Sequence, residues 1–60
     1  MFIVKNPVYV KNLDSKKMMI LHKGDVVNPR LIDGNECVIS LNNVLYSMTN
    51  AIFKLFFEKI

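Results

Sequence analysis

Residues 33–48, DGNECVISLNNVLYSM, decide the fold class of this 60-residue chain. They contain two turn-forming pairs, Asp33-Gly34 and Asn42-Asn43, whose residues tolerate left-handed backbone angles at little cost. Apolar and polar residues alternate through 36–41 and 44–48, as in strands with one buried face. Two tight turns at this spacing predict a three-stranded antiparallel meander, which is typical of a small all-β sandwich or barrel. In the first turn we expect Gly34 to need a positive φ angle.

Shorter apolar segments precede the meander. Residues 2–4 and 8–10 predict strands interrupted by Pro7, which donates no ladder hydrogen bond and therefore belongs at a sheet edge or a bulge. The polar residues 11–17 predict a long loop, and the apolar residues 18–21 predict the strand that follows it.

A turn after that strand leads into a further strand, predicted over residues 26–32. Three of its apolar residues, Val27, Leu31 and Ile32, are expected to enter the core. Pro29 interrupts the segment and predicts a bend there.

The last segment, residues 49–60, is open to two conformations. As a strand, it would turn one set of apolar side chains to the core, namely Phe53, Leu55 and Phe57. As a helix capped by Thr49, it would place a different set on one face, namely Ile52, Leu55, Phe56 and Lys59. Its length favours a helix, whereas its isoleucine and phenylalanine content favours a strand.

The segment MMILHKGDVVNPRLIDGNECVISLNNVLYSMTNAIFKLF, residues 18–56, resembles the body of an SH3-like small barrel. In that family an apolar pair leads through a Lys-Gly-Asp turn into a strand, as residues 20–27 do here. An Asp-Gly turn then opens a meander with a tight distal hairpin, as the two turn pairs above do. The resemblance implies a short 3₁₀ turn at 48–51 and a closing strand that starts with 52–55. It therefore implies an all-β, five-stranded SH3-like barrel, with a short C-terminal helix as the alternative ending.

The chain departs from the peptide-binding members of that family. Those domains line their groove with aromatic side chains, including a tryptophan pair after the acidic turn. Here Asn35, Glu36 and Cys37 follow the turn, and the chain has no tryptophan. Only Tyr9 and Tyr46 could contribute to such a groove. Binding of proline-rich peptides is therefore not expected, because the stacking surface that they need is missing.

Length and composition limit the remaining possibilities. Sixty residues, of which 52% are hydrophobic and 22% charged, predict one folded domain over residues 1–60. The sequence has no apolar run of about 18 residues that would span a membrane. It also lacks a basic N-terminal segment followed by an apolar run, the pattern of a secretory signal. We therefore expect a cytoplasmic protein with no membrane partner.

No set of residues predicts a catalytic, metal or cofactor site. His22 is the only histidine and Cys37 the only cysteine, and neither has a partner at a spacing suited to such chemistry. Cys37 alternates in phase with Ile39 and Leu41, which predicts a buried, small apolar residue. The two glycines are isolated and cannot form a phosphate-binding loop. We expect a non-enzymatic protein without a cofactor.

High hydrophobicity favours a protein-interaction module. A barrel of this size fully buries about 15 to 20 side chains, whereas 52% of the 60 residues are apolar. The last strand would be apolar on both faces, and a small barrel covers only one of them. We expect this strip to bind a protein partner or a second copy of the chain. The candidate contact residues are Tyr9, Tyr46, Ile52, Phe56 and Ile60.

The charge distribution keeps a second function open. The net charge is +3, and residues 11–30 hold five basic residues against two acidic ones. This excess predicts a small nucleic-acid-binding barrel as the alternative function. Aromatic residues are not interleaved with the lysines of residues 11–17, although bases in single strands are normally held by stacking. The candidate residues are Lys11, Lys16, Lys17, Lys23 and Arg30.

Residue usage suggests an origin. Asn, Lys, Ile, Met, Phe and Tyr, whose codons are AT-rich, make up half of the chain. Short AT-rich reading frames are common in bacterial viruses. We therefore expect a bacteriophage-encoded protein that binds and modulates a host protein in the host cytoplasm.

Overall fold

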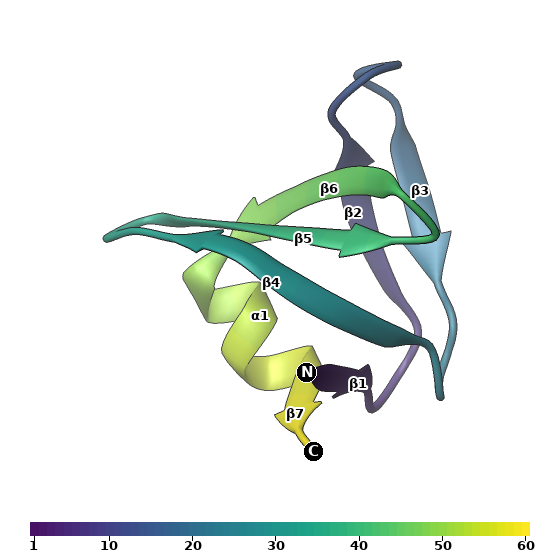
Figure 1. Ribbon diagram of the computed structural model, residues 1–60, viewed down its shortest axis with the longest axis vertical. Coiled ribbons are helices and arrows are strands. Elements are labelled where there is room, and N and C mark those ends of the chain that lie inside the picture. The colour runs from purple at the N-terminus through teal and green to yellow at the C-terminus, as the bar shows by residue number, and fades with distance from the viewer.

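A computed structural model describes all 60 residues as seven strands and one short helix. The elements are β1 (Phe2–Val4), β2 (Val8–Asn12), β3 (Met18–Leu21), β4 (Val26–Ile32), β5 (Glu36–Leu41), β6 (Val44–Thr49), α1 (Asn50–Phe56) and β7 (Phe57–Lys59). The strands form one curled antiparallel sheet in the order β3-β2-β6-β5-β4-β1-β7. Figure 1 shows this half-barrel, with α1 at one side next to β7 and both termini.

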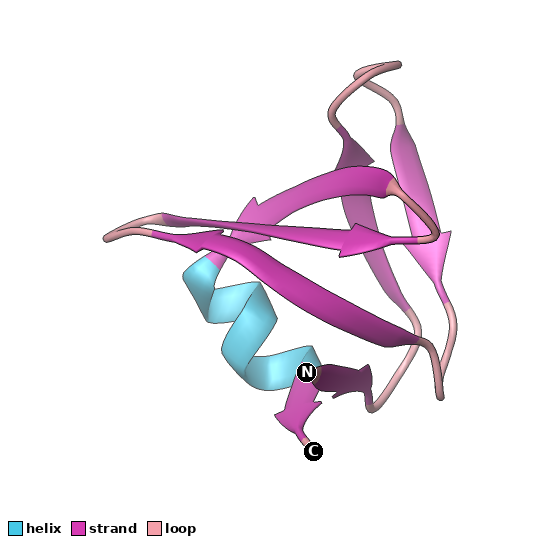
Figure 2. Ribbon diagram, in the orientation of Figure 1, coloured by secondary structure: helices cyan, strands magenta, loops and turns pink.

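The expected fold class, a small barrel-like all-β domain with a short helix, is confirmed (Figure 2). The architecture is compatible with an SH3-like barrel, but it has seven strands instead of five. The number differs because the two ends of the chain pair with each other. β1 pairs with the first residues of β4 on one side and with β7 on the other. The first and last strands therefore add to the five expected ones.

The predicted meander is present as β4-β5-β6. Its second turn is built as expected, because Asn42 and Asn43 have φ angles of 53° and 65° between the paired residues Leu41 and Val44. Asparagine adopts these left-handed angles more readily than most residues do. The Asn42-Asn43 pair therefore sets the register of the β5–β6 hairpin.

The first turn of the meander has a different basis from the one predicted. Gly34 has no positive φ angle, and a Cβ added there would meet nothing within 4 Å. The Asp33 carboxylate instead accepts hydrogen bonds from the backbone N–H groups of Glu36 at 2.8 Å and Asn35 at 3.0 Å. The prediction for Gly34 is wrong, because a side-chain acceptor shapes this turn.

β4 bends at a bulge, as Pro29 predicted, where the pairing with β5 shifts register between Pro29 and Leu31. Val27, before the bulge, is fully buried as expected. Leu31 and Ile32, beyond it, are 55% and 54% exposed, so their predicted place in the core is wrong. The reason is that the end of the β4–β5 hairpin extends past the neighbouring strands (Figure 1).

The C-terminal segment resolves into a helix followed by a short strand. The Thr49 hydroxyl accepts a hydrogen bond from the Ile52 N–H at 3.2 Å, so Thr49 is the helix cap that the sequence suggested. The closing strand over 52–55 implied by the SH3-like resemblance is therefore wrong. Leu55 is 67% exposed, although both alternatives placed it on the apolar face. With seven residues, α1 is too short to cross a membrane.

One hydrophobic core lies between the curled sheet and α1. Its members come from all seven strands and from the helix, so residues from nearly the whole chain meet there. The buried core residues are Val4, Val8, Val10, Leu21, Val27, Cys37, Ile39, Tyr46, Met48, Phe53 and Phe57.

Candidate functional site

The β2–β3 hairpin carries a row of apolar side chains on its outer face. The valines of β2 are buried, so Tyr9 and Lys11, which alternate with them, point outward. Tyr9 pairs with Ile20 and Lys11 pairs with Met18, and directly paired residues share a face of the sheet. Tyr9, Met18 and Ile20 are 65%, 60% and 40% exposed, and together they are called the Tyr9 face below.

Asn12 organises the turn at one end of this hairpin. Its side-chain oxygen accepts hydrogen bonds from the backbone N–H groups of Asp14 at 2.9 Å and Ser15 at 3.1 Å. Its own N–H donates to the Lys17 carbonyl at 2.8 Å, and Lys16 closes the turn with a φ angle of 64°. The loop predicted from its polar composition is thus a defined turn that holds two lysines beyond the end of the Tyr9 face.

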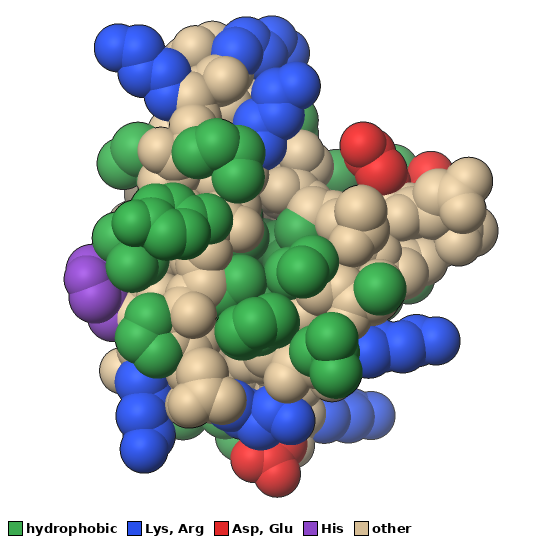
Figure 3. Space-filling view, turned by 180° about the vertical axis from the view of Figure 1, so that it is seen from behind, with side chains coloured by type: hydrophobic (Ala, Val, Ile, Leu, Met, Phe, Trp, Pro, Cys, Tyr) green, Lys and Arg blue, Asp and Glu red, His purple; other side chains and the backbone are tan.

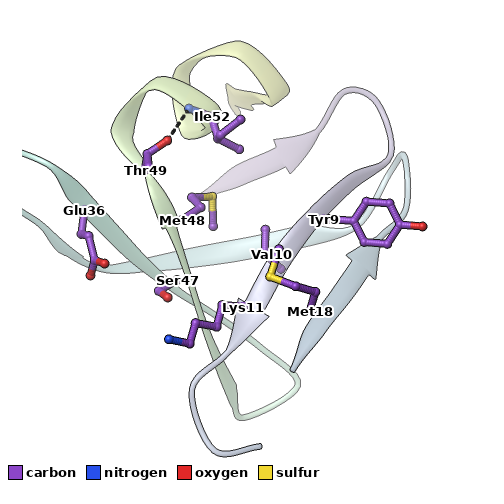
Figure 4. A pocket seen from close by; sticks show the side chains of 9 residues that line it. All are labelled: Tyr9, Val10, Lys11, Met18, Glu36, Ser47, Met48, Thr49 and Ile52. Atoms are coloured by element: carbon purple, nitrogen blue, oxygen red, sulfur yellow. Dashed lines mark hydrogen bonds between the residues drawn. The ribbon is translucent and has the colours of Figure 1, made fainter. Parts of the chain in front are cut away.

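A pocket opens beside the Tyr9 face, where β2 and β6 separate. The two strands pair only at Lys11–Ser47 and Asn12–Tyr46, and the ladder stops there. The space between the separating strands has a volume of about 270 Å³. It is lined by Tyr9, Val10, Lys11, Met18, Glu36, Ser47, Met48, Thr49 and Ile52 (Figure 4).

The pocket has an apolar interior and a polar side. Val10, Met48 and Ile52 line the interior from three different elements, and the capping bond of Thr49 holds Ile52 at the helix start (Figure 4). Lys11, Ser47 and Glu36 lie on the side toward β5 (Figure 4). Because Tyr9 and Met18 belong to both features, the pocket and the Tyr9 face form one continuous surface.

Positive charge borders this surface at both ends. Figure 3 shows apolar side chains gathered in the middle of this side of the molecule, with lysine or arginine above and below them. Four lysines lie on β2, in the turn between β2 and β3 or in the turn after β3, namely Lys11, Lys16, Lys17 and Lys23. The same turns contain two carboxylates, Asp14 and Asp25, and the latter accepts a hydrogen bond from the His22 N–H at 2.9 Å.

Two titratable groups have shifted pKa values, and both lie outside this surface. Burial raises the pKa of the Cys37 thiol, which is a core residue as predicted. The backbone hydrogen bonds from Glu36 and Asn35 lower the pKa of the Asp33 carboxyl. No three side chains of His, Cys, Asp or Glu come together in a way that could hold a metal ion.

The structure separates the five contact residues predicted from the sequence. Tyr9 is on the outer surface, and half-buried Ile52 lines the pocket next to it. Ile60 is exposed at the end of the chain. Tyr46 is buried in the core, and half-buried Phe56 packs against that core. Because residues 50–56 are helical, the C-terminal residues do not form the two-faced apolar strip that was expected.

Sequence reasoning missed most of the apolar residues of the surface, namely Val10, Met18, Ile20 and Met48. The sequence does contain a signal for Met18 and Ile20. The run Met18–Leu21 is apolar at every position, so a strand there must be apolar on both faces. The C-terminal segment is also apolar on both faces if it is a strand, but residues 50–56 form a helix instead.

The basic candidate residues are distributed over three places. One end of the β2–β3 hairpin holds Lys11, Lys16 and Lys17, and Lys23 lies in the turn after β3. Arg30 lies at the bulge of β4. There it lines a second pocket of about 260 Å³, together with Ser40, Asn43 and Leu45.

Comparison of this chain with protein-family models, with curated proteins and with solved structures finds no match. The features of the molecule that bear on its function are the Tyr9 face, the adjoining pocket and the charges around them.

Proposed function

We propose that this chain is a non-enzymatic, SH3-like module that binds another protein through the Tyr9 face and the adjoining pocket. One observation carries the proposal: three large apolar side chains lie exposed side by side, next to a pocket with an apolar interior. Exposed apolar residues scattered singly are normal, but a contiguous apolar patch with a polar border is typical of an interaction site.

The residue types of the surface support a protein as the ligand. Tyrosine and methionine are enriched at protein interfaces, and lysine is depleted from their centres. Here Tyr9 and Met18 belong to both the face and the pocket, whereas Lys16, Lys17 and Lys23 lie in the turns at the ends and Lys11 alone lies beside Met18. The long side chain of Met18 can adapt its shape to a partner. Binding would thus bury the apolar centre and leave the charges at the border in water.

The nucleic-acid alternative has less support. Its basic candidates are spread over three places, and Tyr9 is the one exposed aromatic residue that could stack on a base. This alternative stays a prediction, and it differs from the proposal in its salt dependence. Contacts to phosphates weaken steeply as salt rises, whereas apolar contacts do not.

The test compares two variants of similar exposure as baits in a bacterial lysate, with mass spectrometry as the readout. Tyr9→Ser alters the proposed surface, and Leu55→Ser alters an exposed residue on α1, since the two side chains are 65% and 67% exposed. We expect at least one protein to be retained by the unmodified chain and by Leu55→Ser, and to be depleted about tenfold by Tyr9→Ser. Circular dichroism of each bait verifies its fold.

Two results would overturn the proposal. One is that no retained protein depends on Tyr9. The other is retention of nucleic acid that falls steeply with salt and is lost when Lys11, Lys16 and Lys17 are replaced together by alanine. That second result would establish the alternative function instead.

A further inference from the structure

β3 is an unpaired edge of the sheet, and its backbone is available for a further strand. The sheet begins at β3, which pairs with β2 alone. The Asn12 N–H donates to the Lys17 carbonyl, so the backbone groups of Lys17 point toward β2. In an antiparallel ladder, the backbone N–H and C=O groups of successive residues point alternately toward and away from the neighbouring strand. The backbone groups of Met19 therefore also point toward β2, whereas those of Met18 and Ile20 point outward.

β3 is short, at four residues, but it lacks the other features that normally protect an edge strand. β3 consists of Met18–Leu21, with no charged residue, no proline and no irregularity in its pairing with β2. The opposite edge of the sheet, β7, carries the charged residues Glu58 and Lys59. An apolar edge with free backbone groups is a template for pairing with another strand.

The free edge has defined ends. At one end, Lys16 has a φ angle of 64°, which turns the chain away from the strand direction. At the other end, the His22 N–H is already bonded to the Asp25 carboxylate. A strand added to this edge would therefore pair with Met18–Leu21 only, and its flanking residues would reach the two turns.

We propose that β3 receives an extended segment of a partner protein as an eighth strand, and that this segment is apolar in its centre and acidic at both ends. The inference rests on the proposed function and specifies its binding mode and the chemistry of its ligand. In this mode the outward backbone groups of Met18 and Ile20 bond to the added strand. Alternate side chains of that strand then lie beside Met18 and Ile20 on the outer face and beside Met19 on the other face.

The lysines at the two ends of β3 favour acidic flanks. Lys16 and Lys17 precede the strand and Lys23 follows it, while Lys11 pairs directly with Met18. The two aspartates of the same turns offset only part of this charge. Acidic residues at either end of an added strand therefore meet an opposite charge, which speeds association and sets the position of the strand.

The same lysines argue against a second copy of this chain as the occupant. If two β3 edges paired antiparallel, Lys17 of one copy would approach Lys23 of the other. If they paired parallel, each lysine would approach its equivalent. Like charges that face each other across an interface are unfavourable in both arrangements. A second copy would form only where salt screens this repulsion.

The test uses a capped synthetic peptide with a central Val-Thr-Val-Ile-Val run and two glutamates at each end, titrated into the isotope-labelled chain. Amide hydrogen exchange is the decisive readout, because the N–H groups of Met18 and Ile20 are free at the edge and become bonded only when a strand is added. We expect protection at these two amides and little change at Met19, whose N–H already faces β2.

Two control peptides separate the parts of the proposal. A peptide with lysines in place of the glutamates tests the charges, and it should bind about tenfold more weakly at low salt. A peptide N-methylated at every central residue loses the donors of both edges, and it should not protect Met18 and Ile20.

A pair of variants tests the location. Ile20→Glu places a charge on the proposed face and should weaken binding about tenfold or more. Leu31→Glu places the same charge on an exposed residue of β4, outside the proposed edge, and should leave binding unchanged. The amide spectrum of each variant without peptide is recorded first, to verify that both variants are folded.

The results distinguish failure of this inference from failure of the proposed function. Binding without protection of Met18 and Ile20, or equal binding of the N-methylated peptide, overturns strand addition, yet the Tyr9-dependent interaction stands. Stronger binding of the lysine-flanked peptide overturns the acidic chemistry. Absence of peptide binding at millimolar concentration overturns the inference as a whole, while the lysate experiment separately decides the proposed function.

Discussion

The ring of Phe2 lies edge-on against the ring of Phe53, with centroids 4.7 Å apart and planes at 63°. Phe53 in turn stacks on Phe57 at a centroid distance of 5.0 Å. These three rings belong to β1, α1 and β7, so the contact joins the first strand to the C-terminal helix and strand. The Lys5 N–H also donates to the Phe56 carbonyl at 2.7 Å, which ties the same two parts of the chain together.

Phe53→Ala should therefore destabilise the protein strongly. Removing this buried ring leaves a cavity and two unpartnered aromatic neighbours, and we expect the free energy of unfolding to fall by about 3–5 kcal/mol. Leu55→Ala is the matched control from the same helix, and because Leu55 is exposed it should change stability by about 0.5 kcal/mol or less. Urea denaturation of the two variants measures both values. Equal losses would contradict the helical packing.

Thr49→Ala should shorten or fray α1. The variant loses the hydroxyl that accepts the Ile52 N–H, and we expect it to cost about 1 kcal/mol. Thr49→Ser keeps the acceptor and should retain most of the stability. Thermal melts followed by circular dichroism compare the two, and a similar loss in both would show that the hydroxyl does not cap the helix.

The two glycines should respond differently to alanine. Gly24 has a φ angle of +95°, so Gly24→Ala should destabilise by about 1–2 kcal/mol even though a Cβ there meets nothing within 4 Å. Gly34 has neither a positive φ angle nor a close neighbour, so Gly34→Ala should be neutral or stabilise by about 0.5 kcal/mol through the unfolded chain. Chemical denaturation of the two variants measures both changes in stability. Destabilisation by Gly34→Ala would restore the original prediction for this turn.

Asp33 should make the β4–β5 turn sensitive to acid. The hydrogen bonds from Glu36 and Asn35 lower the pKa of its carboxyl in the folded state below that in the unfolded state. The stabilisation is thus fully present above the unfolded pKa and is lost as the pH falls through the folded pKa. Asp33→Asn keeps an oxygen acceptor but does not titrate, so its stability should fall less between neutral and acidic pH. Urea denaturation across that range tests the difference, and identical pH profiles would refute it.

Sequence predicted the parts of the fold that depend on local preference. The alternation of residues 36–41 and 44–48 gave strands with the expected buried face, because a half-buried strand must alternate. Asn42-Asn43 gave the turn between them, because asparagine accepts left-handed angles. The candidate surface was predicted less well. Tyr9 and Ile52 lie in it, whereas Tyr46 lies in the core.

The sequence by itself determined the all-β class, the meander and the bend at Pro29, because alternation and turn residues specify them locally, and it offered Thr49 as a cap if the last segment is helical. The tertiary structure decided which apolar residues are covered. Leu31 and Leu55 have the same local character as core residues, but no other element packs over them. It also decided that α1 is a helix, because the helical segment lets Phe53 pack against Phe2 of the first strand and against Phe57 of the last. Burial is a property of contacts between distant segments, so local pattern cannot specify it.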